Sequence, residues 1–127
     1  MIDALFSEPY YLGAKKALDA TALRQEALAG NIANLETPGY KRVDIAPSFS
    51  AELSRACAAQ DGSQISALKP QLSVDTAAPG SGPDGNNVSL ENELIKMNQN
   101  TLTHTLETQL VTDELMKLKM AITGKSM

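Results

Sequence analysis

Residues 23–42 read LRQEALAGNIANLETPGYKR, a stretch that ends a long helix and stops it with a tight turn. Pro38 disfavours helical backbone geometry at Thr37. A Pro-Gly pair at the centre of a turn suits type II geometry, in which Gly39 takes a positive φ. The stretch therefore predicts that the helix stops before Thr37 and that the chain reverses at Pro38 and Gly39.

Polar and aromatic side chains flank this turn. Asn31 and Asn34 are three residues apart, so they share a helix face and can bind carbonyl groups or a neighbouring chain. Tyr40 leaves the turn as an aromatic anchor with a hydrogen-bonding tip. Turn chemistry alone leaves two interpretations open, an ordinary loop after a helix and a segment with a function of its own.

A long amphipathic helix precedes the turn, from about Pro9 to Leu35. Pro9 suits the first turn of a helix, and Ser7 is a candidate N-cap. Steps of three and four residues give a mainly apolar stripe, which Thr21 and Gln25 interrupt. This spacing predicts a seam of the coiled-coil type. The stripe consists of Tyr11, Ala14, Leu18, Thr21, Gln25, Leu28, Ile32 and Leu35.

A second long helix is predicted from Ser89 to Thr123, with Ser89 as its N-cap and Gly124 just past its end. Glu91 and Glu93 lie in its first turn, where the helix dipole favours acidic side chains. Two stripes run along this helix, so its apolar surface covers a wide arc. The first contains Leu90, Leu94, Met97, Thr101, His104, Thr108, Val111, Leu115, Leu118 and Ile122, and the second contains Ile95, Leu102, Leu106, Met116 and Met120.

These stripes favour a subunit of an assembly over a free catalyst. Burying a Leu-sized side chain contributes about 1.5–3 kcal/mol, whereas fixing the backbone of one residue costs about 1–2 kcal/mol. One such helix cannot stand alone, and a bare pair is marginal. Because the second stripe then needs another chain, we expect the isolated protein to be largely disordered in dilute solution.

The segment between the helices has a different composition. A short helical turn containing Phe49 and Leu53 is predicted after Pro47. Weak alternation over residues 64–76 predicts a strand or two, and residues 77–87 are rich in Pro, Gly and Asn, as linkers are. We expect a loop-rich segment that is poorly ordered unless something holds it. The chain thus divides into residues 1–42, 43–88 and 89–127, which together form one domain, and the apolar positions of the alternation are Ile65, Leu72 and Val74.

The length and net charge of the chain limit the classes of molecule that it is expected to bind. A chain of 127 residues and 13.5 kDa suits one small domain. It has 11 Lys and Arg against 15 Asp and Glu, a net charge of -4, which disfavours general binding to nucleic acid or to anionic membranes. We interpret Lys15-Lys16 and Lys41-Arg42 as solvated or subunit-bridging charges.

Residues that carry chemistry are scarce. Cys57 is the only cysteine and His104 the only histidine, which excludes an internal disulfide and a Cys-based zinc site. We interpret His104 as packed or hydrogen-bonded, and Cys57 as a half-buried side chain in a loop. Met97, Met116 and Met120 are interpreted as side chains that fill packing gaps. The sequence predicts no catalytic, cofactor-binding or metal site and argues against an enzyme.

The first six residues have neither a basic region nor an apolar stretch long enough for a cleaved signal peptide. No run approaches the roughly 20 apolar residues of a membrane-spanning helix. We therefore expect a protein without a membrane span that stays in the cytosol or leaves it without a cleavable leader.

Two motifs resemble one known family. Residues 23–34 running into Thr37-Pro38-Gly39-Tyr40-Lys41 resemble the N-terminal signature of the bacterial flagellar rod and hook proteins. Residues 84–94, DGNNVSLENEL, resemble the entry to the last helix in a proximal rod protein of this family. The sister proximal rod protein FlgC usually has P-N-V-N/D-x-x-x-E-M there, which this chain lacks.

The resemblance implies a structural subunit of the proximal rod in the flagellar basal body. Such a subunit transmits torque, lines the export channel and leaves the cytosol through the flagellar type III export apparatus to reach the periplasmic rod. Its N- and C-terminal helices pair as an antiparallel coiled coil. The implied partners are FlgC and further rod proteins, the adaptor protein FliE, the MS-ring or export gate, and other copies of the chain. No cofactor is implied.

Assembly contacts are expected from the signature and from the apolar stripes. Two alternatives remain open, FlgC itself and a small helical-hairpin regulator or chaperone that binds a single partner. The expected assembly residues are Asn31, Asn34, Thr37, Pro38, Gly39, Tyr40, Leu18, Leu28, Ile32, Leu35, Leu94, Met97, Val111, Leu115, Leu118 and Ile122.

Overall fold

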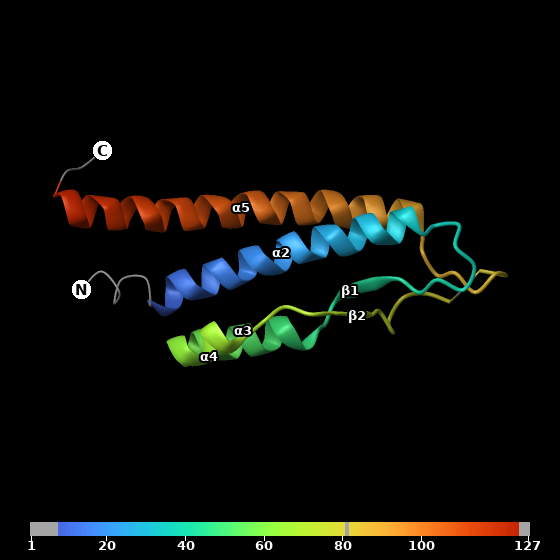
Figure 1. The fold of residues 1–127 in the computed structure, drawn as a ribbon, viewed down its shortest axis with the longest axis horizontal. Helices are drawn as coiled ribbons and strands as arrows, with labels where there is room; N and C mark the ends of the chain where they lie inside the picture. Colours follow the sequence, from blue (N-terminus) through green and yellow to red (C-terminus); the bar gives the residue numbers. More distant parts are fainter. Residues whose placement is uncertain (1–7, 81, 125–127) are drawn as a thin grey trace.

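The computed structural model describes residues 8–80 and 82–124 (Figure 1). Most of the described chain is helical, and the longest helices lie at the two ends of the sequence, as predicted. The elements are α2 (Pro9–Ala33), β1 (Val43–Ile45), α3 (Ser48–Ala58), α4 (Gly62–Ala67), β2 (Leu72–Val74) and α5 (Leu90–Thr123).

The helices α2 and α5 lie side by side and run in opposite directions (Figure 1). Two hydrogen bonds define this pairing, from Asn31 to Glu93 near one end and between Thr21 and His104 further along. Because the sequence number falls along α5 as it rises along α2, the pair is antiparallel.

The structure confirms the predicted C-terminal end of α5 but not the predicted side-chain cap at its N-terminal end. Ser89 occupies the N-cap position of α5, but its side chain makes no capping hydrogen bond. Gly124 has a φ of 67° and its N–H binds the Met120 carbonyl, which ends α5 in a left-handed cap. Ser7, the candidate N-cap of α2, lies outside the described residues.

The connecting segment contains more regular structure than the sequence predicts. The turn expected after Pro47 extends into α3, and Ile65 lies in the short helix α4 instead of a strand. Leu72 and Val74 do form a strand, β2, which pairs antiparallel with β1. In Figure 1, α3 and α4 lie along α2 on the side away from α5.

The apolar core of the described chain is small. Leu28 of α2 and Ile65 of α4 are fully buried, and Phe49 and Ala56 of α3 are nearly so. The burial of these side chains holds the connecting segment against α2. This packing is the physical reason that the connecting segment is ordered in this fold. These side chains leave the pairing of α2 with α5 to other interactions.

Candidate assembly site

The face of α5 that lies against α2 is mainly polar. Asn100 is almost fully buried there, and its Nδ2 donates to the Thr21 carbonyl at 2.9 Å and to Gln25 Oε1 at 2.8 Å. Positions spaced by three and four residues define this face, as in one seam of a heptad repeat. They are Glu93, Met97, Asn100, His104, Glu107, Val111, Glu114 and Leu118, all of them buried or half-buried.

Thr21 joins the two helices at the centre of this seam. Its hydroxyl donates to Glu107 Oε2 at 2.7 Å and lies 2.9 Å from His104 Nδ1. The interpretation of His104 as a hydrogen-bonded side chain is confirmed. Thr21 and Gln25, which interrupt the apolar stripe of the sequence, therefore bind α5, as Asn31 does nearer its start.

The apolar stripe predicted to pair α5 with α2 does not do so along its whole length. Leu94, Leu115 and Ile122 are 46%, 42% and 57% exposed, whereas Met97 and Val111 are half-buried. Leu118 is half-buried as well. The prediction is wrong for Leu94 because polar side chains occupy the inner face there, and for Ile122 because the last turn of α5 extends past the start of α2 (Figure 1).

A second apolar stripe lies on the outer face of α5, away from α2. Leu102 and Leu106 are 64% and 60% exposed. We call this surface the outer stripe; it consists of Ile95, Leu102, Leu106, Met116 and Met120. Met116 and Met120 are exposed in the described chain and fill no packing gap within it, whereas Met97 is half-buried.

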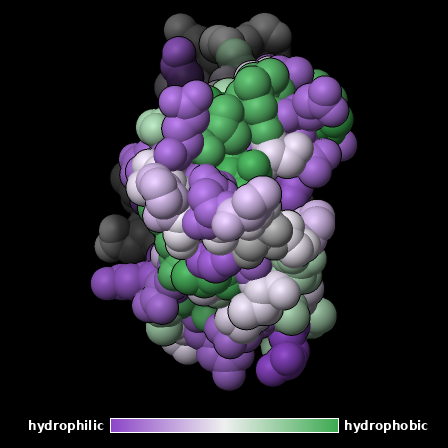
Figure 2. Space-filling model, turned by 90° about the vertical axis from the view of Figure 1, so that its right-hand side faces the viewer, coloured by the Kyte–Doolittle hydropathy of each residue, from purple (hydrophilic) through white to green (hydrophobic). Residues whose placement is uncertain are grey.

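Figure 2 views the molecule end-on, from the side where α5 begins, and shows hydrophobic surface along its upper part, where α5 lies. A soluble monomer usually avoids large contiguous apolar patches, and such a patch marks an interaction site. The outer stripe is accordingly the candidate assembly surface of this chain.

A buried ionic cluster lies near the start of α5. We call it the Arg42 cluster; it consists of Arg42, Glu93, Asp75 and Asp44. Arg42 is 3% exposed, so its interpretation as a solvated or subunit-bridging charge is wrong. Its Nε donates to Glu93 Oε1 at 2.7 Å, its Nη1 to Asp75, and its Nη2 to Asp44 at 3.2 Å. One side chain thereby ties α5 to β1 and to the loop after β2.

Electrostatics favour the charged forms in this cluster. Burial acts to lower the pKa of Arg42, but the hydrogen bonds that it donates to Glu93 and Asp75 outweigh burial and raise that pKa above its ordinary value. Burial acts to raise the pKa of Asp44, but the hydrogen bond from Arg24 and the others it accepts hold that pKa below its ordinary value. Arg42 and Asp44 are therefore both charged at neutral pH.

The turn after α2 packs against the second motif of the sequence. Gly39 has a φ of 73°, as predicted, and its N–H donates to the Asp84 carbonyl at 2.9 Å. Asn86 Nδ2 donates to the carbonyls of Asn34, Leu35 and Thr37 at 2.9–3.0 Å, and so caps the C-terminal end of α2. These bonds fix where α5 begins relative to where α2 ends.

The asparagines of the signature act within the chain. Asn31 is fully buried, and its amide exchanges hydrogen bonds with the backbone of Val43 at 2.8 and 2.9 Å. Tyr40 donates its hydroxyl to Asn31 Oδ1, and Asn34 donates to the Gly30 carbonyl. The prediction that both asparagines bind carbonyl groups is confirmed.

The other signature and stripe residues divide by exposure. Thr37, Pro38 and Gly39 are exposed and available to a neighbour. Leu18, Ile32 and Leu35 are half-buried, and Leu28 is fully buried.

Cys57 is half-buried, but it lies in α3 and not in a loop. The contacts of Cys57 with α2 are close, because a Cβ added at Gly13 would stand 2.7 Å from its Sγ.

Within residues 8–80 and 82–124, acidic, cysteine and histidine side chains form no group that could hold a metal ion. The helices in that part of the chain all fall short of the length and apolarity that a membrane crossing requires. What the described residues do offer is a pair of helices locked in register and an exposed apolar face.

The amino-acid sequence also matches known proteins. Residues 14–41 match the family model described as "Flagella basal body rod protein". The chain is 31% identical to "Flagellar basal body rod protein FlgB" of Borrelia hermsii over 76% of this chain and 83% of that protein. It is 32% identical to the protein of the same name from Escherichia coli strain K12, over 69% of this chain and 74% of that protein. Aeromonas hydrophila FlgB is 28% identical over 86% and 89% of the two chains. The chain therefore belongs to the FlgB family of flagellar basal body rod proteins.

Proposed function

We propose that this chain is a structural subunit of the flagellar rod and that the outer stripe of α5 is its main contact with neighbouring subunits. The observation that carries this proposal is the division of α5 into a polar face toward α2 and an apolar face toward solvent. An apolar helix face at heptad spacing is stabilised when a second helix covers it. The subunit performs no chemistry; it transmits torque to the hook and lines the export path.

The helix pair extends into a larger coiled-coil packing when subunits meet. In each subunit the polar seam joins α2 to α5, and the outer stripe then packs between the helices of the next subunit. Leu94, Leu115 and Ile122, which are exposed in the single chain, add to this contact. The exposed turn at Thr37, Pro38 and Gly39 contacts a neighbour at the other end of the subunit.

The partners follow from this place in the rod. FlgC and further rod proteins supply the neighbouring helices, and the adaptor protein FliE and the MS-ring or export gate lie below. The rod stands in the periplasm, and the chain reaches it through the type III export apparatus without a cleaved signal peptide. The support for these partners is family membership together with the uncovered face of α5.

A single substitution on the outer stripe tests the proposal. Leu106→Asp places a charge at a position that is 60% exposed in the single chain but apolar and covered in the assembly. We expect the variant to be exported yet missing from isolated basal bodies, and the cells to be non-motile. Thr108→Asp introduces the same residue at another exposed position of α5, off the stripe, and is expected to leave swimming intact.

The two variants separate assembly from folding. Both substitutions lie on exposed positions of α5, so the intact chain should have the same helical circular dichroism in each case. If Leu106→Asp enters basal bodies and supports normal swimming, the outer stripe is not the assembly surface.

A further inference from the structure

The outer stripe is part of a regular heptad seam. Together with Gln99, Gln109 and Asp113, it follows alternate steps of four and three residues, and all of these positions are exposed. Such spacing marks the contact line of a coiled coil. We call this line the outer seam; it consists of Ile95, Gln99, Leu102, Leu106, Gln109, Asp113, Met116 and Met120. Asp113 is the one charged residue of the outer seam.

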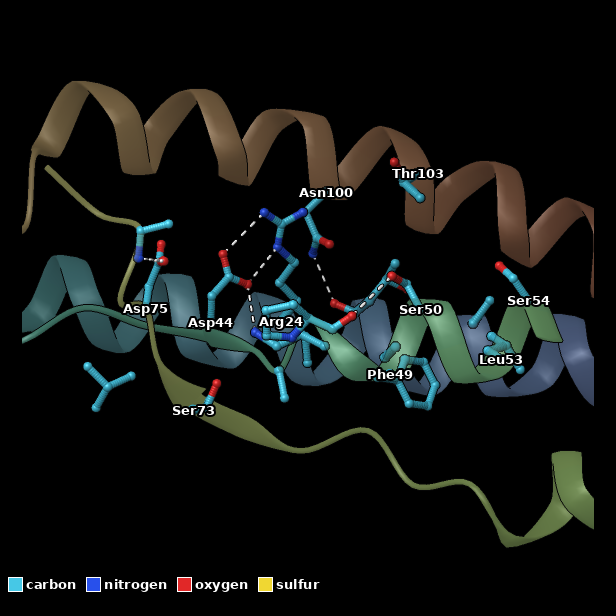
Figure 3. A pocket seen from close by; sticks show the side chains of 18 of the residues that line it. Arg24, Asp44, Phe49, Ser50, Leu53, Ser54, Ser73, Asp75, Asn100 and Thr103 are labelled. Carbon is cyan, nitrogen blue, oxygen red and sulfur yellow. Dashed lines mark hydrogen bonds and ion pairs between the residues drawn. The ribbon is translucent and has the colours of Figure 1, made fainter. Parts of the chain in front are cut away.

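Helix α2 has a free face with the same spacing. Asn100 of α5 approaches α2 on one side, and Asp44 of β1 pairs with Arg24 on another (Figure 3). The exposed residues of α2 beyond Tyr10 all lie on one remaining line, which also follows steps of four and three. We call this line the α2 face; it consists of Lys15, Asp19, Ala22, Glu26, Ala29 and Ala33. Lys15 is the one cation of the α2 face.

The outer seam of one copy and the α2 face of a second copy complement each other in one antiparallel register. The shared spacing keeps the two lines in phase, so that Asp113 lies opposite Lys15 while Leu106 lies opposite Ala22, a side chain small enough to leave room for it. The facing pairs are Ile95 with Ala33, Gln99 with Ala29, Leu102 with Glu26, Leu106 with Ala22, Gln109 with Asp19 and Asp113 with Lys15.

The two remaining polar positions are compatible with this register. Leu102 packs on the methylene groups of Glu26, whose carboxylate extends to solvent, as long charged side chains do on apolar surface. Gln109 uses one amide hydrogen for Asp113 of its own helix and has a second one for Asp19.

Charge and coverage select this register over the others. Moving the second copy by one heptad brings Asp113 opposite Glu8 in one direction and opposite Ala22 in the other. A parallel arrangement with Asp113 opposite Lys15 places Leu102 before the start of α2 and leaves it uncovered. Of these arrangements, the antiparallel register alone pairs opposite charges and covers Leu102, and complementary charges are what fix register at an interface.

We propose that the outer seam of one copy binds the α2 face of a second copy in this register. Because α2 and α5 are antiparallel within each chain, two copies joined in this way point in the same direction. The contact joins two different surfaces, so it repeats from copy to copy. The proposal rests on the rod function above and specifies α2 as the helix of the next subunit that the outer stripe meets.

The register also displaces one copy along the helix axis relative to the next. The numbers of facing residues add up to 125 within one chain, for Thr21 with His104 and for Gln25 with Asn100. Across the contact they add up to 128, for Ala22 with Leu106. The difference of three residues corresponds to about 4.5 Å at roughly 1.5 Å per residue. A contact between unlike surfaces with such a displacement builds an open helical array instead of a closed ring.

Site-specific cross-linking tests the contact. In a chain with Cys57→Ser, one variant carries Leu106→Cys on the outer seam and a second carries Ala22→Cys on the α2 face. Produced in one cell, the two variants should give a disulfide-linked dimer in isolated basal bodies, and neither variant alone should. Leu106→Cys paired with Thr108→Cys, on another exposed face of α5, should give at least about tenfold less, because a specific interface fixes which positions meet.

A further pair of cysteines tests the register. Ala29→Cys should form a dimer with Gln99→Cys, the position that it faces. With Leu106→Cys, which lies one heptad away from it in the contact, it should give at least about tenfold less.

Charge exchange tests whether the partner is a second copy of this chain. With Cys57 intact, Asp113→Lys or Lys15→Asp alone should lower the amount of the chain in basal bodies at least about tenfold, because like charges that meet at an interface are strongly unfavourable. Asp113→Lys with Lys15→Asp in the same chain should restore assembly, since opposite charges then meet again. Lys16→Asp makes the same change of charge at the adjacent position, off the α2 face, and should not restore it.

The outcomes separate this contact from the rod function. Basal bodies that contain the chain but give no 22–106 dimer overturn the contact and leave the rod function standing. Normal assembly of Asp113→Lys overturns the contact as well. A loss that Lys15→Asp fails to restore means that the outer seam meets a different rod protein, and equal yields of the 22–106 and 29–106 dimers overturn the register. Absence of the unmodified chain from basal bodies overturns both the contact and the rod function.

Discussion

Removing the guanidinium of Arg42 should destabilise the fold more than removing any exposed charge. Arg42→Met keeps an unbranched side chain in place but leaves Glu93, which is 1% exposed, without its cation. Asp75 and Asp44 lose a partner in the same step. Breaking a buried ion pair by removing one partner typically costs about 3–5 kcal/mol, since the remaining charge stays desolvated.

A matched control isolates burial from charge. Arg24 also binds Asp44, at 2.9 Å, but its side chain is 33% exposed. Exposed or partly exposed pairs contribute about 0–1 kcal/mol, so Arg24→Met should cost no more than that. Arg42→Met/Glu93→Leu removes both buried charges, and we expect it to recover much of the loss because neither partner is left unpaired.

Urea unfolding followed by far-UV circular dichroism measures these differences. The core is small, so the titrations need a fixed concentration of trimethylamine N-oxide, which strengthens the folded state of every variant alike. Domains are stable by about 5–15 kcal/mol, so a loss of about 3–5 kcal/mol should shift the urea midpoint of Arg42→Met far below that of the parent chain. Equal losses for Arg42→Met and Arg24→Met would refute the view that Arg42 is buried among its carboxylates.

Three further outcomes follow from particular contacts. The folded-state pKa of Asp44 is depressed. The stability that its charge contributes to the fold is therefore complete above the unfolded pKa of about 3.9 and is lost as the pH falls below that value. Asp44→Asn should flatten the acid limb of a stability–pH curve. Gly13→Ala places a Cβ 2.7 Å from the Sγ of Cys57 and should lower the urea midpoint. The Cβ of Gly30→Ala meets nothing within 4 Å, so that variant should be more stable by up to about 1 kcal/mol, the cost of a glycine in a helix. Asn86→Ala removes three hydrogen bonds to carbonyls of the turn that follows α2 and should cost about 1–3 kcal/mol in the same titration.

The two long helices could be predicted from the sequence because their signals are local. Pro9 opens α2, and Gly124 ends α5 with a positive φ. The turn at Gly39 depends on one dipeptide, which constrains its own backbone whatever surrounds it. Signals of this kind need no knowledge of the rest of the chain.

The rotation of α5 and the Arg42 cluster could not be predicted in the same way. The apolar stripe predicts which face of α5 lies inward, but the inner face contains Asn100, His104 and Glu107. Arg42 finds Glu93 and Asp75 at separations of 51 and 33 residues. Nothing near Arg42 in the sequence distinguishes it from an exposed cation such as Lys41, because its environment is made by elements far along the chain.

The polar seam gives the outer stripe a defined direction. Apolar seams tolerate small rotations and shifts, whereas a buried polar pair fixes register at some cost in stability. Thr21 with His104, and Asn100 with Gln25, bond only when α5 presents one face to α2. Leu102 and Leu106 then point away from α2 in every copy, so every copy presents the same apolar surface, and a regular array requires such uniformity.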